Sequence, residues 1–535
     1  MADELARVAE DSARGSFYLI SGTAISTVIL AIASIVIGRI LGPELYGQYT
    51  LALVVPQLLF LFADMGLNQG IIKFTSSLRV QGEHDRVKKI VKLGLLFKTF
   101  TGVMIFAIGF VFADWFASLF LQRPDLTFYI RIASLGILFQ VVFTTATSVF
   151  VGLDRTEYNA VATNIQAVAK TVVSIALVLL GLSVTGALIG NVASFAVGGA
   201  AGISMLFITM RGKKGSKSSH GRVEEIRALV RYGAPLYVSL LLVGFIPVYQ
   251  NVILAFFASD AEIGNFKAAQ NFATLMTVLS IPISTALLPA FSKLDSSTAQ
   301  KIKAFFKIAN KYTAMLIIPI TVLIVTYSTV IVQIIYGITY AQAPLFLATY
   351  CLVYLLVGLG YLTLTSFYNG MSETKISLGI SLITFLCLAV LSPVLARAYG
   401  VPGLIVAFLI GSTAGTIYGS YIARRRFQIE FDTASLIKIY LISMVSVFPS
   451  VLMLRLVSGP AINLAGGGFF YLFTYATLVP LAKVVSGPEI KMAGSIVQKI
   501  PLLNLVVRPL LRYEQKLLWI IEKPKTKIQP LITTS

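Results

Sequence analysis

Charged side chains occur inside long apolar segments of this sequence, where a charge is costly. Four lie within such segments and the last lies near the edge of one: Arg39, Asp64, Lys98, Lys170 and Arg131. Charged groups at membrane depth usually face a bundle interior or a water-filled cavity. Cations in such a medium of low dielectric constant attract anions strongly. The sequence therefore marks these residues as candidates for lining a bundle interior or cavity, where the four cations could attract an anion.

The five charged residues differ in the roles that the sequence leaves open for them. Lys170 lies near the middle of its segment and is the best candidate for an anion contact. Arg39 and Arg131 could instead extend to the outer membrane interface, and Lys98 could extend towards the cytoplasm. Asp64 has three open roles: it could pair with a nearby cation, bind a coupling ion or hold helices together.

Residues for covalent or metal chemistry are scarce. The two histidines, His84 and His220, fall in polar loops, and the two cysteines, Cys351 and Cys387, fall inside apolar segments. Neither a disulfide framework nor a CxxC metal site can be built from them. We therefore expect no catalytic residue, no metal and no cofactor.

The composition explains where the charges must sit. Of 535 residues, 57% are hydrophobic and 12% are charged, against roughly 25% charged in a soluble domain. The mean hydropathy is +0.85. Apolar segments of about 20 residues are long enough to cross the hydrocarbon core of a bilayer. The chain is therefore expected to be an all-α integral membrane protein with about fourteen transmembrane helices.

Charged and turn-forming clusters delimit the expected spans. In the first half they are 17–41, 50–72, 91–113, 128–150, 158–180 and 184–208. In the second half they are 233–257, 268–291, 312–336, 344–367, 376–396, 401–422, 436–457 and 466–485.

The net charge of +20 is unevenly distributed along the chain. Basic runs occupy alternate connections: KFTSSLRVQGEHDRVKKIVK, RGKKGSKSSHGRVEEIRALVR and ARRRF. This bias follows the positive-inside rule and predicts a multi-pass protein of the cell membrane with both termini cytoplasmic. The charge is thus explained by topology, and no nucleic-acid partner is expected. The basic tail, 487–535, suits either an interfacial helix on an anionic leaflet or a small packed hairpin.

The first six spans resemble the next six at a separation of about 217 residues. Four motifs carry the likeness, in order along the chain. YGQY at 46–49 matches IGNF at 263–266, VKKIVKLGLLFK matches IKAFFKIANKYT, GLDRT at 152–156 matches GMSET at 370–374, and VTGAL at 184–188 matches VPGLI at 401–405. Two units of six helices insert with the same orientation and are related by a pseudo-twofold axis along the membrane normal. Two such lobes enclose a central cavity, as in transporters.

The repeat divides the chain into an N-terminal lobe (1–210), a basic cytoplasmic linker (211–232) and a C-terminal lobe (233–423). Two additional helices (424–486) and the tail follow. The repeat counterparts of the five charges are all uncharged: Phe256, Ile281, Met315, Cys387 and Ala348. We therefore expect the first lobe to carry the charged chemistry of the cavity.

These motifs also carry a family resemblance. LGPELYGQYTLA, followed by LFADMGLNQGIIKF, resembles the opening of polysaccharide-export and Wzx-type flippases of the multidrug/oligosaccharidyl-lipid/polysaccharide exporter superfamily. The resemblance covers most of the chain. It implies that the protein moves a polyprenyl-linked saccharide from the cytoplasmic to the outer leaflet without breaking bonds. Membrane lipids, this lipid-linked saccharide and glycosyltransferases of the same pathway would then be its partners.

The resemblance also assigns roles to polar and small residues. In this interpretation the buried cations attract the anionic head of the lipid, while amides bind sugar hydroxyls. The amide candidates in the second lobe are Gln250, Asn251, Gln270 and Asn271. The small residues of the motifs are expected to be structural: Gly42, Pro43, Gly47, Gly66, Gly152, Gly264 and Gly370. Gly42 and Pro43 should break the first helix, and Gly47 should let the following segment approach a neighbouring backbone.

Two other functions remain open from the sequence. A multidrug or cation extruder of the same superfamily is disfavoured by the two extra C-terminal helices and by the excess of buried cations over carboxylates. A membrane-embedded glycosyltransferase or polymerase is less favoured still, because every outer connection is short.

Overall fold

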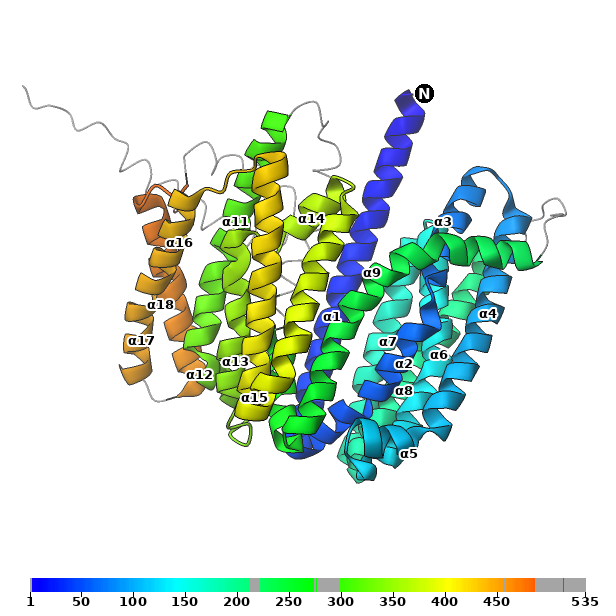
Figure 1. The fold of residues 1–535 in the computed structure, drawn as a ribbon, viewed down its shortest axis with the longest axis horizontal. Helices are drawn as coiled ribbons and strands as arrows, with labels where there is room; N and C mark the ends of the chain where they lie inside the picture. The colour runs from blue at the N-terminus through cyan, green and yellow to red at the C-terminus, as the bar shows by residue number, and fades with distance from the viewer. Residues whose placement is uncertain are drawn as a thin grey trace, which may run out of the picture.

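The computed structural model describes residues 2–211, 222–273, 276, 299–456, 459–485 and 513, and the described part contains helices and no strands. Figure 1 shows two groups of long helices standing side by side, with α1 leaning between them and the last helices at one flank. This is the two-lobed all-α arrangement expected from the apolar spans and the repeat.

The first lobe contains eight α-helices and three short helical segments. They are α1 (Ala2–Ala52), α2 (Val54–Asp64), α3 (Leu67–Val80), α4 (His84–Val111), α5 (Ala113–Trp115), η1 (Phe116–Phe120), η2 (Pro124–Leu126), α6 (Thr127–Gly152), α7 (Thr156–Leu177), η3 (Val178–Leu182) and α8 (Ser183–Met210).

The second lobe follows the same order. It comprises α9 (Arg222–Phe257), a helix over 260–273, α11 (Ala299–Thr326), α12 (Ser328–Ile335), α13 (Ala343–Cys351), η4 (Leu352–Leu359), α14 (Thr363–Gly370) and α15 (Thr374–Phe427). Three further helices pack against α11 and α12 of this lobe: α16 (Thr433–Val445), α17 (Val447–Leu456) and α18 (Pro460–Leu481).

Glycines separate consecutive spans in three long stretches of helix. Gly42 (φ 75°), Gly181 (φ 87°) and Gly400 (φ 61°) adopt left-handed backbone conformations that favour glycine. Each lies between two spans expected from the sequence. The halves of α15 on either side of Gly400 pack against each other, and a Cβ on Gly403 would fall 2.0 Å from the Leu395 carbonyl oxygen. The break predicted at Gly42 is confirmed.

The described residues contain eight helices long and apolar enough to cross a membrane, or nine if a bent pair is one span. Three of the eight contain the glycine breaks just described. Leu241–Phe257 forms a shorter apolar helix, and most of the expected span 268–291 lies outside the described residues. The membrane-spanning class is therefore confirmed, while the count of fourteen stays a prediction.

Two expected spans are interrupted within their length. The second span ends its first helix at Asp64, where Met65 (φ 49°) and Gly66 (φ 78°) are both left-handed before α3 begins. The tenth span bends by 48° between Leu359 and Thr363. Broken membrane helices leave backbone groups that need other partners. Hydropathy alone predicts a single continuous span for each segment.

Helix α9 connects the two lobes. It is continuous from Arg222, so the end of the predicted basic linker is helical. Its first half packs against α2 and α3 of the first lobe, and it also packs against α15 of the second lobe. Figure 1 shows α9 running obliquely across the gap between the lobes.

The apolar core is shared at one end and divided at the other. One cluster of buried side chains joins both lobes, with Tyr46 and Leu126 from the first and Leu254 and Tyr336 from the second. Two smaller clusters lie near the opposite end. In the described residues, one of these is centred on α3, α4 and α6, and the other on α11, α14 and α15.

Candidate functional site

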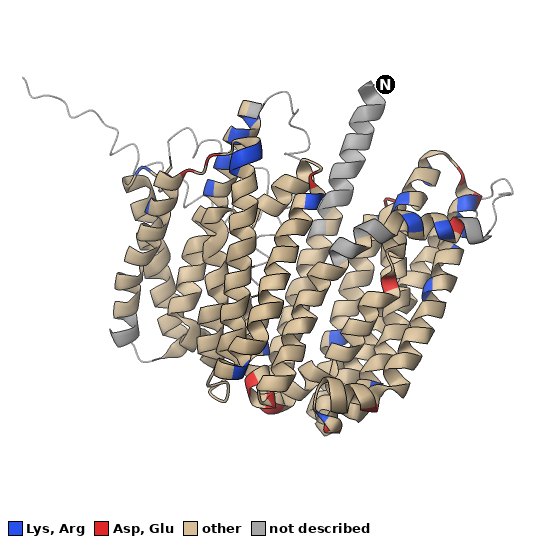
Figure 2. Ribbon diagram, in the orientation of Figure 1, with Lys and Arg blue, Asp and Glu red and all other residues tan. Residues whose placement is uncertain are grey.

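The two ends of the bundle differ in charge. In Figure 2, most Lys and Arg residues gather at the end where α3 and α15 terminate. We call this the basic end and the opposite one, near Gly42, the outer end, because the positive-inside rule expects basic segments in the cytoplasm. The orientation itself stays a prediction.

Lys98 and Asp64 form a buried ion pair in the first lobe. The Nζ atom of Lys98 on α4 lies 2.6 Å from Oδ1 of Asp64, and the lysine side chain is only 1% exposed. Asp64 is 18% exposed and ends α2 at the helix break. Of the three roles that the sequence left open for Asp64, the structure contains the pairing with a cation. Lys98 therefore does not extend freely towards the cytoplasm.

The helix break beside Asp64 is packed against α9. A Cβ on Gly233 would fall 1.9 Å from the carbonyl oxygen of Gly66. The Tyr237 hydroxyl donates a hydrogen bond to the carbonyl of Leu61, in the last turn of α2. The left-handed Gly66 and the glycine opposite it thus let two backbones touch where the second span is broken.

Lys170 lies in the neighbourhood of Lys267, a lysine that the expected spans did not include. It lies on α7, is half-buried, and forms no hydrogen bond or ion pair within the described part of the chain. Lys267, from the helix over 260–273 of the second lobe, lies close enough for the two positive charges to repel each other. The charged chemistry is therefore not confined to the first lobe. Lys267 precedes the expected span 268–291 by one residue, which is why the analysis of spans excluded it.

Two amides of the second lobe form a hydrogen-bonded chain with Lys267. Its Nζ donates a hydrogen bond to Oε1 of Gln270 at 3.0 Å, and Nε2 of Gln270 donates to Oε1 of Gln250 at 3.4 Å. Gln250 is buried, and so is Asn251, whose Oδ1 has no partner among the described residues. Asn271 donates to the hydroxyl of Tyr46, across the lobe boundary, at 2.5 Å. Of the four predicted amides, Gln250 and Gln270 therefore belong to a polar network with Lys267, and Asn271 lies at the boundary between the lobes.

Arg39 and Arg131 lie apart from this network. Arg39 is exposed and donates hydrogen bonds to the carbonyls of Ile334 at 3.1 Å and Ile335 at 3.4 Å, in the second lobe. Arg131 is exposed, with its guanidinium 5.9 Å from the ring centroid of Phe110. Arg39 thus joins the lobes near the outer end, and Arg131 has the surroundings of an interfacial arginine.

The small residues of the sequence motifs lie at close backbone contacts. A Cβ on Gly47 would fall 1.8 Å from the carbonyl oxygen of Asp260, and one on Gly264 would fall 1.8 Å from that of Pro43. A Cβ on Gly152 would fall 1.9 Å from Oγ1 of Thr75. Gly370 ends α14. The backbone approach expected at Gly47 is therefore present.

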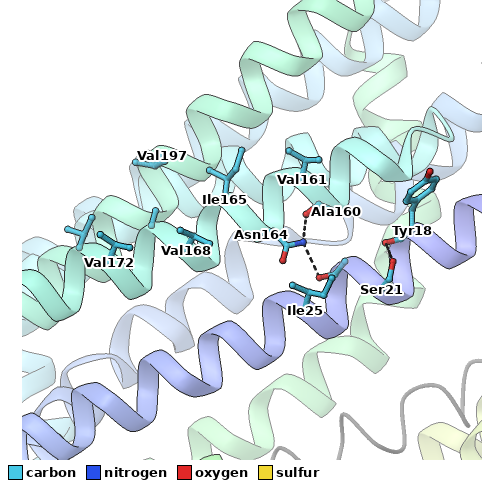
Figure 3. Close-up of a pocket in the computed structure, with 13 residues that line it drawn as sticks. Tyr18, Ser21, Ile25, Ala160, Val161, Asn164, Ile165, Val168, Val172 and Val197 are labelled. Atoms are coloured by element: carbon cyan, nitrogen blue, oxygen red, sulfur yellow. Dashed lines mark hydrogen bonds between the residues drawn. The ribbon is translucent and has the colours of Figure 1, made fainter. Parts of the chain in front are cut away.

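An apolar groove runs between α1 and α7 on the far side of α7 from Lys170. Its volume is about 730 Å³, and Figure 3 shows Ile25, Ile165, Val168 and Val172 along it. Near one end, Nδ2 of Asn164 donates to the carbonyl oxygens of Gly22 and Ala160. The groove is lined almost wholly by hydrocarbon, and a membrane lipid chain fits such a surface.

The described residues contain no group of three or more His, Cys, Asp or Glu side chains that could hold a metal ion. What they do contain is one lysine from each lobe, Lys170 and Lys267, near enough for their charges to interact, with Gln270 and Gln250 linked to Lys267 by hydrogen bonds. Such a site can bind an anion and polar groups attached to it. Two lobes around a polar site are the architecture of a membrane transporter.

Comparison with known proteins places this architecture in a family. Residues 12–295 match the family described as polysaccharide biosynthesis protein. The chain belongs to this family, within the multidrug/oligosaccharidyl-lipid/polysaccharide exporter superfamily.

Individual relatives agree with this assignment. The chain is 25% identical over 459 residues to the lipid II flippase MurJ of Bacillus subtilis (strain 168), covering 77% of this chain and 82% of that protein. It is 24% identical over 258 residues to a putative O-antigen transporter of Shigella dysenteriae, covering 48% of this chain and 61% of that protein.

Solved structures share the fold at low sequence identity. A lipid II flippase MurJ in an inward closed conformation matches with a TM-score of 0.72 at 15% identity, covering 86% of this chain and 98% of that one. An inward-facing multidrug resistance transporter of the MATE family matches with a TM-score of 0.65 at 16% identity, covering 75% and 94%.

Proposed function

We propose that this protein is a flippase that moves a polyprenyl-linked oligosaccharide or polysaccharide precursor from the cytoplasmic to the outer leaflet. The observation that carries the proposal is a polar site with a lysine from each lobe: Lys267 is hydrogen-bonded to Gln270, and Lys170 has no hydrogen-bond or ion-pair partner among the described residues. Two cations in a medium of low dielectric constant need an anion between them, and the phosphate groups of a lipid carrier supply one.

The neighbouring groups suit the remainder of such a substrate. Gln250 and Gln270 present amides that can exchange their mutual hydrogen bond for bonds to sugar hydroxyls. The Oδ1 atom of Asn251, which has no hydrogen-bond partner in the described part of the chain, is a further acceptor. The relatives support the proposal, since their names are lipid II flippase and putative O-antigen transporter.

Alternating access would carry the bound headgroup across the bilayer without covalent chemistry. The lobes would rock around the Lys170–Lys267 site and expose it to one leaflet at a time. The lipid tail would stay in the membrane, against apolar surfaces such as the groove between α1 and α7. Glycosyltransferases that assemble the saccharide remain predicted partners.

The test is transport by purified protein in vesicles. A polyprenyl-diphosphate-linked oligosaccharide with a fluorescent sugar is incorporated, and an impermeant quencher reports how much of it is exposed on the outer surface over time. We expect protein-dependent exchange between leaflets and recovery of the substrate covalently unchanged. A cleaved diphosphate or an extended glycan would support the enzyme alternative. Efflux of cationic dyes with no movement of the saccharide lipid would support the multidrug extruder.

A further inference from the structure

The outer end of the bundle is closed by a reciprocal contact between the lobes. Gly47 and Gly264 occupy corresponding positions in the repeat, and so do Pro43 and Asp260. Each glycine touches the backbone of the residue that lies four positions before the other glycine. A contact of this form is what a pseudo-twofold axis between the two crossing segments requires. Because backbone meets backbone, no side chain fits between the lobes while this contact is made.

Two side chains reinforce this contact from corresponding connections of the two lobes. Arg123, in the connection before α6, has its Nε 3.0 Å from Oδ1 of Asp260, and its Nη2 donates to the Ala258 carbonyl at 2.9 Å. Tyr340, in the connection before α13, donates to the Gly38 carbonyl at 2.5 Å. Each lobe thus holds the end of the other lobe's first helix, but only Arg123 does so through an ion pair.

The two ends of the molecule are joined differently. At the outer end one apolar core runs through both lobes, whereas the described cores near the basic end are centred on separate lobes, with Leu229 and Val230 of the connecting helix α9 packed into that of the first. The contacts around Gly47 and Gly264 therefore hold closed the end opposite the basic connections.

We call the backbone contacts of Gly47 with Asp260 and of Gly264 with Pro43 the outer gate. We propose that the Arg123–Asp260 ion pair is the latch of this outer gate: the pair forms while the outer end is closed and breaks when it opens. The proposal concerns how the gate is held shut and goes beyond the proposed function.

The properties of the pair suit a latch that must open. Arg123 is 25% exposed and Asp260 is 16% exposed, so water can solvate both charges once they separate. A deeply buried pair would be held by a large desolvation penalty on opening, because both charges would lose their partner without gaining water. The backbone contacts at Gly47 and Gly264 fix how closely the two lobes approach. The ion pair adds an attraction that both charges can replace by binding water when the lobes separate.

The test measures distances between the lobes in purified protein without any substrate, so its outcome does not depend on the transport assay. Cys351 and Cys387 are first replaced by alanine. Spin labels are then attached at Leu119→Cys and Ile338→Cys, which are 63% and 83% exposed at the outer end of each lobe. A second sample carries labels at the exposed positions Val80→Cys and Glu430→Cys at the basic end.

We expect Arg123→Asp and Asp260→Arg each to raise the fraction of molecules with a long outer distance several-fold and to shorten the distance at the basic end. The double variant Arg123→Asp/Asp260→Arg should return both distributions towards those of the parent. The matched control is Glu373→Arg, which reverses one partner of the Arg426–Glu373 pair within the second lobe (2.6 Å) and should leave the outer distance unchanged.

Outer distances that are the same in the single reversals and in the parent would overturn the proposal. A shift that the double variant fails to reverse would also overturn it, because the effect would then come from something other than the attraction between the two residues.

Discussion

The Lys98 ammonium lies 2.6 Å from the Asp64 carboxylate at the point where the second span is broken. The lysine comes from the middle of a helix that passes beside the break, so the pair fixes α4 to the end of α2. The left-handed residues Met65 and Gly66 follow directly, and Gly233 of α9 packs against Gly66. The ion pair therefore stabilises an interrupted segment where three helices meet.

Removing one partner of this pair should destabilise the protein. We expect Lys98→Ala or Asp64→Ala to lower the free energy of unfolding by about 3–5 kcal/mol, because each leaves a buried charge without a partner. The double variant Lys98→Met/Asp64→Leu should be milder than either. Thermal unfolding in detergent measures the effect. The control is Arg155→Ala, from an exposed pair with Glu157 at 3.3 Å, with an expected loss below about 1 kcal/mol. Equal stability of all four variants would show that the pair contributes little.

Transport should depend on Lys170 and Lys267. We expect Lys170→Ala and Lys267→Ala each to reduce the flipping rate by about ten- to a hundredfold, the loss of one hydrogen bond to a charged group. Lys170→Arg should retain partial activity if charge alone matters, and little if a compact ammonium is needed. Rates are measured in vesicles with equal amounts of protein. Met315→Ala and Cys387→Ala, which change the repeat counterparts of Lys98 and Lys170, should be milder. Full activity of both lysine variants would remove them from the substrate path.

The glycines of the outer gate should tolerate no side chain. Gly47→Ala or Gly264→Ala would place a Cβ 1.8 Å from a carbonyl oxygen of the other lobe, so we expect the outer end to stay open and transport to fail. Interlobe distances between spin labels at positions 119 and 338 report the opening. Gly468→Ala is the matched control, since a Cβ there meets nothing within 4 Å. An outer end that still closes in both gate variants would argue against the crossing as a steric gate.

The orientation can be checked with single cysteines in a background lacking Cys351 and Cys387. Val80 and Ile338 are 80% and 83% exposed at opposite ends of the bundle. We expect Val80→Cys to resist an impermeant thiol reagent in intact cells and Ile338→Cys to react, because basic segments stay in the cytoplasm. Permeabilised cells, in which both should react, provide the control. The reverse pattern in intact cells would invert the topology.

Local features of this fold could be predicted from the sequence because they depend on neighbouring residues. Gly42 ends a span beside a proline, and its left-handed conformation follows from the residue type. The repeat motif also indicated that Gly47 approaches another backbone. Its partner, Asp260, could not be predicted, because that contact depends on how the two lobes are placed in space.

The site was predicted less completely, for physical reasons. Hydropathy locates a charge within a span but says nothing of the helix opposite it, so the partner of Lys98 stayed open. The break after Asp64 is caused by the positive φ angles of Met65 and Gly66, which hydropathy does not predict. Lys267 was missed because a lysine at the edge of a span resembles an ordinary interfacial residue, and only the crossing of the lobes brings it to Lys170.

The reciprocal contact of Gly47 and Gly264 has the geometry of an isologous interface, in which one surface patch meets its own copy. In a homodimer of identical chains, any substitution at such a patch appears twice, once on each side of the axis. Two halves joined in one polypeptide escape this restriction, and Pro43 and Asp260 have diverged at corresponding positions. Only the second lobe has a carboxylate at this position, Asp260, and it pairs with Arg123. A single chain can therefore contain one such ion pair, whereas a symmetric homodimer would have to contain two.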